Sequence, residues 1–197
     1  MSSLCHVQSR HVCVVLPRNV RVHAGQRAHE VQPDFHLVRV EPEVLAHDAG
    51  VESDLDIPIV PVHANANIPP IPPARRYAEL GTYLAEAIAA APSAQRMALI
   101  ASGHLATEVG GPRQFLGGNS PDDDFDRDAV GWMRDGDLES AIAGCSFARL
   151  AAAGNVTAQY LNFVTALAAA GGRPATFAEG TPSRFAAGPF FSWDMSS

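Results

Sequence analysis

The stretch Leu55-Asp-Ile-Pro-Ile-Val-Pro-Val-His-Ala-Asn-Ala-Asn-Ile-Pro-Pro-Ile-Pro-Pro-Ala-Arg-Arg76 decides how the chain is organised. Its apolar run, Ile57 to Val62, is typical of a buried strand with prolines at its edges. The polar loop Ala64 to Asn67 follows, and the next prolines cannot continue a sheet because they lack a backbone N–H. Arg75-Arg76 then opens a long helical pattern. We therefore predict a strand, a loop and a helix in that order.

A second strand-to-loop unit follows in Met97-Ala-Leu-Ile-Ala-Ser-Gly-His-Leu-Ala-Thr-Glu-Val-Gly-Gly-Pro-Arg113. Strands that alternate with helices favour an α/β fold with a central, mostly parallel sheet flanked by helices. We expect a first helix over about 74–91 and a second that begins at the Ser120 cap with Pro121 and ends at Gly136. Two further helices are expected over 137–143, capped by Asp137, and over 156–170, capped by Asn155. Closing strands are expected over 175–177 and 189–193. The predicted core comprises Ile59, Val60, Leu84, Ile88, Leu99, Ile100, Trp132, Leu161 and Val164.

Composition separates residues 1–54 from residues 55–197 within what we interpret as a single domain of 197 residues. Six of the eight histidines lie in the atypical N-terminal segment, which we expect to pack less regularly. From Leu55 onward the pattern becomes regular and rich in alanine. No apolar run approaches about 18 residues, so no membrane span is expected.

The charge and the cysteines exclude several classes of function. The net charge of -7 argues against a nucleic-acid-binding surface, which needs a basic face. All 14 basic residues are arginine, so Schiff-base chemistry through lysine is excluded. Three cysteines do not form a disulfide framework, and we expect a reducing, cytoplasmic setting. Cys145 has no obvious basic neighbour and is expected to be a buried thiol.

The two quoted stretches resemble the C-terminal half of the class III extradiol ring-cleaving dioxygenases, the LigB-like superfamily. In that family a segment of the form Pro-Ile-Val-Pro-Val, Asn, Pro-Pro and Arg-Arg leads into a helix. A strand then ends in Ser/Thr-Gly-Gly-Leu/Met-Ser-His. The resemblance covers about residues 55–193 in order and spacing, and it implies the LigB-like dioxygenase fold.

The resemblance implies a non-haem Fe(II) enzyme that opens a catechol-type aromatic ring with both atoms of O₂. In the family, iron is held by two histidines and a glutamate, an arrangement that leaves positions open for diol and O₂. The glutamate position reads Gln159 here. The family's histidines come from Ser-His-x-Pro-like and Asp-His-like motifs, and neither motif occurs in this chain. Histidines that are candidates by residue type alone are His6, His11, His23, His29, His36 and His47.

His104 is the candidate catalytic residue. It follows a strand and a glycine, where open α/β sheets place reactive groups, and a histidine there acts as acid or base near neutral pH. The competing interpretation is a structural or exposed loop histidine. The family's base histidine aligns with Thr107, its preceding serine with Ala106 and its second glycine with His104, so His104 replaces the base only if the loop runs differently.

The remaining polar features have weaker functional interpretations. His63 ends a strand beside Asn65 and is a low-weight candidate for lining a cleft or binding metal. The acidic run Asp122–Asp124 is expected to stabilise a helix start. Gly110-Gly111-Pro112-Arg113 lacks the strand-to-helix setting of a phosphate loop.

Three alternatives follow from the sequence. The chain is an active dioxygenase with unrecognised iron ligands, a silent or truncated relative that acts as a non-catalytic subunit, or an α/β protein that binds a small ligand. Whether the chain forms a homo-oligomer or binds a partner subunit stays open at this point. Because Gln159 replaces the carboxylate, we predict that the isolated chain binds Fe(II) weakly, and that no two histidines converge with one carboxylate.

Overall fold

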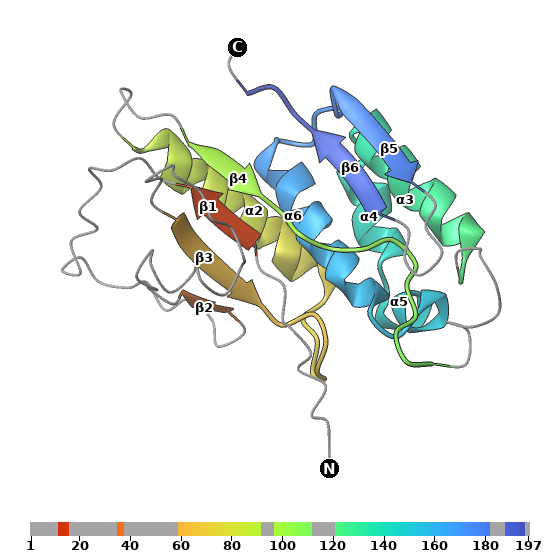
Figure 1. Cartoon of the computed structure of the whole chain (residues 1–197). Coiled ribbons are helices and arrows are strands. Elements are labelled where there is room, and N and C mark those ends of the chain that lie inside the picture. Colours follow the sequence, from red (N-terminus) through yellow and green to blue (C-terminus); the bar gives the residue numbers. More distant parts are fainter. Residues whose placement is uncertain are drawn as a thin grey trace, which may run out of the picture.

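The computed structural model describes residues 12–15, 35–37, 59–91, 97–111, 121–181 and 188–195. They form the mixed α/β arrangement shown in Figure 1, which confirms the coarse α/β class. A four-stranded sheet lies on one side, helices fill the middle, and a two-stranded sheet lies on the other side. Within this part of the chain, no helix is long and apolar enough to cross a membrane.

The larger sheet has the order β2-β3-β1-β4, formed by β1 (Val12–Val15), β2 (Phe35–Leu37), β3 (Ile59–Ala64) and β4 (Ala98–Ile100). Every pairing in it is antiparallel, which corrects the expectation of a mostly parallel sheet. The physical reason is the place of β1. Strands β3 and β4 do run in the same direction, but β1 lies between them and runs against both.

Helix α2 (Ala74–Ala89) connects β3 to β4 and has two packed faces. Leu80 packs with Val62 of β3, while Tyr77 and Ala78 belong to the main core. At Gly81 the helix touches α6 so closely that an added Cβ would overlap the carbonyl oxygen of Thr165. Glycine at this position therefore allows the two helices to pack against each other.

Helix α6 (Leu161–Ala169) is the centre of the core and is preceded by the 3₁₀ turn η2 (Thr157–Tyr160). Residues 161–168 are all buried, as an apolar pattern on every side of a helix predicts. Around it lie α3 (Asp123–Asp135), α4 (Leu138–Gly144) and α5 (Phe147–Ala153).

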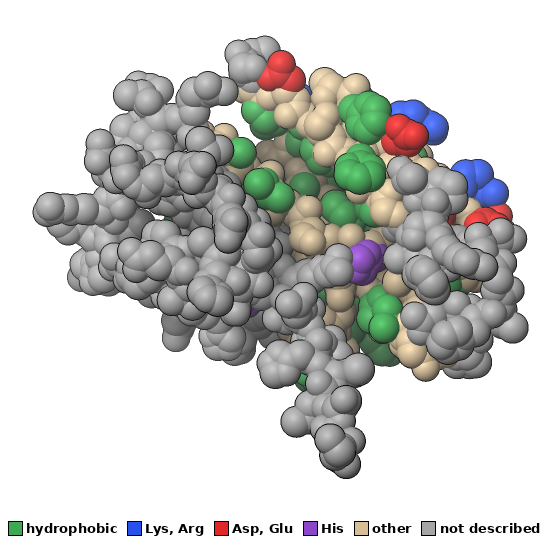
Figure 2. Space-filling model, in the orientation of Figure 1, with side chains coloured by type: hydrophobic (Ala, Val, Ile, Leu, Met, Phe, Trp, Pro, Cys, Tyr) green, Lys and Arg blue, Asp and Glu red, His purple; other side chains and the backbone are tan. Residues whose placement is uncertain are grey.

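The C-terminal strands β5 (Phe177–Thr181) and β6 (Gly188–Ser192) form an antiparallel pair beside α3. Phe191 of β6 faces the core, where its ring lies edge-on to Phe163. Phe190 points outward and is 61% exposed. Figure 2 shows hydrophobic side chains gathered around β6 and α6, with acidic and basic side chains next to each other near the margin.

The predicted core was partly right. Leu161 and Val164 are fully buried, and five of the others are half-buried against the core: Val60, Leu84, Ile88, Leu99 and Trp132. Ile100 was predicted wrongly, because it is 53% exposed. Strand β4 alternates exposed, half-buried and exposed, so only Leu99 faces α2, because successive side chains of a strand point to opposite faces of the sheet. The side chain of Ile59 lies outside the described residues.

Helix boundaries show two corrections. The cap of α3 is Asp122, whose carboxylate accepts from the Phe125 N–H at 2.8 Å; the predicted cap, Ser120, lies outside the described residues. Asn155 does not cap a long helix, because its side chain bonds both backbone groups of Val109. By contrast, Asp137 caps α4 and Gly136 ends α3 with a positive φ of 73°, as predicted.

Candidate functional site

One edge of the larger sheet carries both histidines whose side chains the structure describes. Strands β3 and β4 run in the same direction and therefore end at the same edge. His63 lies near the end of β3, and His104 lies in the segment that follows β4; both are half-buried. The predicted location of His104 beyond the carboxyl end of its strand is confirmed.

Gly103 holds the backbone before His104 directly against the turn that carries Gln159. A Cβ at Gly103 would overlap the carbonyl oxygen of Gln159 and come within 2.8 Å of a ring carbon of Phe163. Only glycine fits this approach without displacement, because Gln159 belongs to the buried turn η2 and Phe163 to the buried first turn of α6. The position of His104 is thus coupled to the η2–α6 segment.

Asn65 organises the loop that leaves β3. Its amide oxygen accepts from the Ile68 N–H at 3.1 Å, and its amide nitrogen donates to the carbonyl oxygens of Ile68 and Pro70 at 2.6 and 3.1 Å. Its own carbonyl accepts from the Tyr77 hydroxyl at 2.6 Å, and burial raises the pKa of that phenol. The loop is therefore fastened both to itself and to the first turns of α2.

Gln159, at the position where the sequence resemblance implies a carboxylate, faces the same loop. It is 5% exposed, and its Nε2 donates to Oδ1 of Asn67 at 3.1 Å. Its Oε1 is buried and has no hydrogen-bond partner in the described part of the chain. A buried acceptor without a donor costs about 1–3 kcal/mol, so this oxygen is a site at which a donor would be favoured.

Asn162 shows the same pattern one helical turn later. Its Nδ2 donates to the carbonyl oxygen of Ser102 at 2.7 Å, which fixes the amide orientation because a carbonyl only accepts. Its Oδ1 is buried and, among the described residues, has no partner. The Gln159 side chain therefore faces the loop after β3, through Asn67, and the Asn162 side chain faces the segment after β4, through Ser102.

Ala106 and Thr107, where the sequence resemblance implies a serine and a base histidine, carry no acid–base group. Ala106 and Thr107 are 0% and 1% exposed. The Thr107 hydroxyl donates to the Leu105 carbonyl at 2.9 Å, and its N–H donates to the Thr157 hydroxyl at 3.0 Å. Both positions are packed into the core, which leaves His104 as the histidine of this loop.

The described residues do not fit an Fe(II) centre of two histidines and a carboxylate. Among them, no group of three His, Cys, Asp or Glu side chains is placed to hold a metal ion. Gln159 offers a neutral amide that is already bonded to Asn67. Outside the described residues lie His6, His11, His23, His29 and His47, together with the side chain of His36. For these histidines, the expectation that no two of them converge with a carboxylate stays a prediction.

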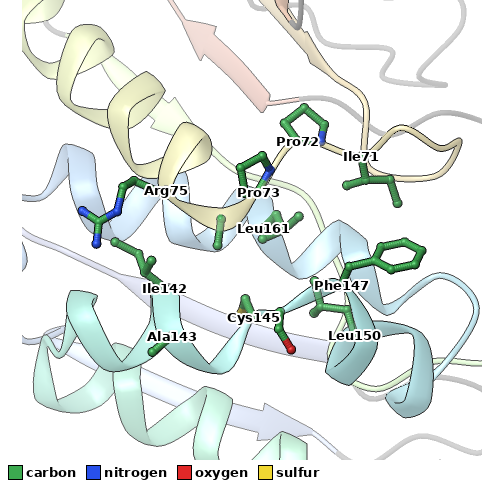
Figure 3. A pocket seen from close by; sticks show the side chains of 12 residues that line it. Ile71, Pro72, Pro73, Arg75, Ile142, Ala143, Cys145, Phe147, Leu150 and Leu161 are labelled. Carbon is green, nitrogen blue, oxygen red and sulfur yellow. The ribbon is translucent and has the colours of Figure 1, made fainter.

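A pocket of about 260 Å³ lies between α2, α4 and α5 (Figure 3). Neither His63 nor His104 lines it, so it gives no support to the expectation that His104 lies in or beside a pocket. Cys145 lies at its wall, and burial raises the pKa of that thiol to about 12 although Arg149 acts in the opposite direction. Cys145 is thus a buried, unreactive thiol, as expected.

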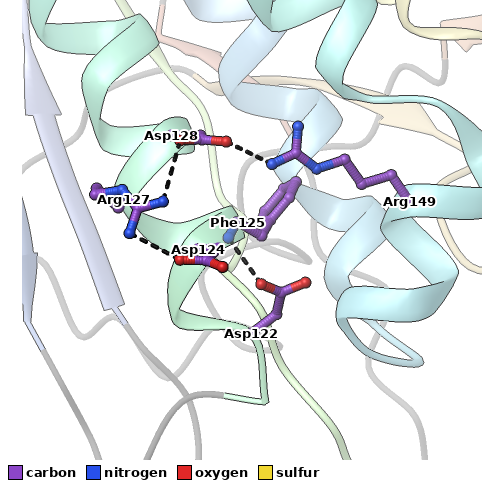
Figure 4. A network of polar contacts seen from close by, with 6 residues as sticks. All are labelled: Asp122, Asp124, Phe125, Arg127, Asp128 and Arg149. Carbon is purple, nitrogen blue, oxygen red and sulfur yellow. Dashed lines mark hydrogen bonds and ion pairs between the residues drawn. The ribbon is translucent and has the colours of Figure 1, made fainter.

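The acidic run at the start of α3 is a structural feature. Figure 4 shows the Asp122 carboxylate at the helix N-terminus and Asp124 bonded to Arg127 at 2.8 Å. Asp128 bonds Arg149 at 2.6 Å, and the Arg149 guanidinium lies 5.6 Å from the ring centre of Phe125. These carboxylates have protein partners, which supports the interpretation that they stabilise the helix.

Comparison of the chain with family models, with curated proteins and with solved structures finds no match in any of the three.

Sequence reasoning missed Asn67 and Asn162, which complete the polar contacts at this edge. The sequence did contain a signal for Asn162, because Asn162 and Thr165 are the two polar residues in the otherwise apolar run Leu161–Ala170. Asn67 lies in a loop of small and polar residues, so the sequence alone offered no reason to choose it over Asn65.

Proposed function

We propose that this chain is an extradiol ring-cleaving dioxygenase of the class III type, whose described residues supply the part of the site that binds a catechol-type diol. The observation that carries the proposal is the pair of buried amide oxygens on Gln159 and Asn162. Each oxygen lacks a hydrogen-bond donor among the described residues, and a catechol offers two hydroxyl donors. The resemblance of residues 55–193 to the dioxygenase family points to the same substrate class.

His104 would move the proton in this proposal. It follows β4 in the segment whose backbone is held against Gln159, and imidazole exchanges a proton near neutral pH. A histidine in that position would take a phenolic proton from the bound diol. The close backbone contact of Gly103 with Gln159 would fix the position of His104 relative to the η2–α6 segment, which carries Gln159 and Asn162.

Iron and O₂ enter through the family resemblance alone. Iron would supply the activation of O₂ and the coordination of the diol. Because the described residues do not fit such a centre, its ligands would come from histidines outside them or from a partner subunit. A homo-oligomer or a second subunit is therefore part of the proposal.

A second candidate function is a catalytically silent relative that binds the diol without cleaving it. The bond from Gln159 to Asn67 favours this candidate, because it occupies the amide at the family's carboxylate position. Such a chain would act as a non-catalytic subunit or as a small-ligand-binding α/β protein.

The test is anaerobic loading of the purified chain with Fe(II), followed by measurement of iron per chain and of O₂ uptake with catechol. Stoichiometric iron, O₂ uptake and a ring-opened product would support the enzyme. Catechol binding by calorimetry without iron or O₂ uptake would support the silent relative. Absence of both catechol binding and turnover would overturn both candidates. His104→Ala, with an unchanged far-UV circular dichroism spectrum, is expected to abolish any ring cleavage.

A further inference from the structure

The pocket between α2, α4 and α5 has walls from segments far apart in the sequence. Ile71, Pro72 and Pro73 enter from the chain before α2, Ile142 and Ala143 from α4, and Phe147 and Leu150 from α5. Figure 3 shows these side chains around one hollow, with Leu161 of α6 behind it. None of the polar residues discussed for diol binding lines it.

The size and lining of this pocket suit one small ring. A cavity of about 150 Å³ with apolar walls is enough to hold benzene. The pocket here has about 260 Å³, which leaves room for a ring and a small substituent. Phe147 is among the residues that line the pocket, and its side chain is 59% exposed, so its ring is available to an aromatic partner.

The positive charge of Arg75 favours a negatively charged substituent on the ring of the ligand. It is the one charged residue among those that line the pocket, and Figure 3 shows its side chain beside Ile142. Its Nη2 contacts Oε2 of Glu139 at 3.3 Å, with both side chains more than half exposed. Exposed ion pairs of this kind contribute about 0–1 kcal/mol, so a ligand carboxylate competes for the guanidinium at little cost.

The two polar side chains at the wall do not add covalent chemistry. Burial holds the pKa of the Cys145 thiol at about 12, so the thiolate is scarce at neutral pH. The Ser146 hydroxyl accepts from the Arg149 N–H at 3.3 Å as the cap of α5. Binding in this pocket is therefore reversible and rests on shape, apolar contact and one charge.

We propose that this pocket is a binding site for a small aromatic monocarboxylate, held by the apolar walls and by Arg75. It is separate from the proposed diol site and does not depend on it. Its occupancy would bring together the chain before α2, helix α4 and helix α5, which frame the core helix α6.

The test uses benzoate as the probe and isothermal titration calorimetry on the full chain. Arg75→Gln is expected to weaken benzoate binding about three- to fivefold, as the loss of one exposed charge predicts. Arg127→Gln is the matched control, because its side chain is 69% exposed, against 61% for Arg75, and also pairs with a carboxylate. This control should leave binding unchanged.

Two further measurements keep the proposal open to refutation. Ala143→Trp, at an exposed position that lines the pocket, should fill it and remove benzoate binding, with folding checked by thermal unfolding. Benzyl alcohol should bind more weakly than benzoate to the wild-type chain. Benzoate binding that Arg75→Gln and Ala143→Trp leave unchanged, or no saturable binding, would overturn the proposal. Equal binding of benzyl alcohol would overturn the anionic ligand class. If Ala143→Trp fails to fold, the comparisons of Arg75→Gln with its control and of benzoate with the alcohol still decide.

Discussion

The side chains of Gln159 and Asn67 are joined by one hydrogen bond, from Nε2 of Gln159 to Oδ1 of Asn67 over 3.1 Å. It connects the segment before α6 to the loop after β3, two elements that lie far apart in the sequence. Because Gln159 is 5% exposed and its Oε1 has no partner in the described chain, this bond is the one contact that satisfies its amide group there.

Asn67→Ala should therefore destabilise the chain by about 1–3 kcal/mol, because it leaves both ends of a buried amide without partners. In a Gln159→Met background the same change should cost less than about 0.5 kcal/mol, since no buried amide remains to be satisfied. Urea unfolding of the four proteins in this double-mutant cycle measures the difference. Equal costs in both backgrounds would show that the bond contributes nothing.

Local chemistry made part of this fold predictable. Asp137 and Gly136 have the side chain and the backbone freedom that begin and end helices, and both act as expected. The apolar pattern of residues 161–168 likewise predicted their burial. These features depend on residues that are close in the sequence, so rules of periodicity and helix capping can predict them.

Tertiary pairing was not predictable in the same way. The insertion of β1 between β3 and β4 depends on a strand of four residues whose partners lie far along the chain. Asn155 was expected as a helix cap, but it bonds Val109 across a long sequence separation instead. At the candidate site, the position of His104 followed from strand order, whereas the partner of Gln159 depended on how the loop after β3 folds back.

Close packing of α2 on α6 predicts a large effect at Gly81. Gly81→Ala would place a Cβ against the Thr165 carbonyl oxygen and 2.8 Å from the Cβ of Ala168. We expect a loss of about 1–3 kcal/mol, the usual cost of overpacking, measured by urea unfolding. Gly131→Ala is the control inside α3, where the nearest atom is 3.7 Å away. That change should stabilise the chain by about 0.5–1 kcal/mol through helix propensity. A neutral result at Gly81 would contradict the packing.

Cys145 predicts an alkaline loss of stability. Burial raises the pKa of its thiol from 9.0 to about 12, so the folded state retains a proton that the unfolded state releases. The stability that the protonated Cys145 thiol contributes is fully present below pH 9 and is lost as the pH rises toward 12. The free energy of unfolding then falls by up to about 1.4 kcal/mol per pH unit.

Unfolding measured between pH 8 and 11 should therefore show a shallower decline in Cys145→Ala than in the wild type, since only the wild type has this thiol. Burial raises the pKa values of Tyr77 and Tyr160 in both proteins. Cys145 raises the pKa of Tyr160 further, so its removal makes the alkaline decline shallower through Tyr160 as well. Thiol reagents should modify the wild-type residue slowly at pH 8. Parallel pH profiles, or rapid labelling of Cys145 in the folded chain, would contradict the predicted burial of the thiol.

The last prediction concerns Gln159, at the position where the sequence resemblance implies a carboxylate ligand. Gln159→Glu replaces a buried amide donor by an acceptor that faces Oδ1 of Asn67, so the metal-free variant should lose about 1–3 kcal/mol of stability. If histidines outside the described residues complete an iron centre, the new carboxylate should raise the iron retained after anaerobic loading. Fe(II) should then raise the melting temperature of this variant more than that of the wild type, because a ligand stabilises the state that binds it. Asn162→Asp is the matched control, an equally buried amide whose carboxylate would instead face the Ser102 carbonyl oxygen. Equal iron content and equal thermal shifts in the wild type and both variants would show that position 159 is not part of a metal site, and would favour the silent, diol-binding relative over the enzyme.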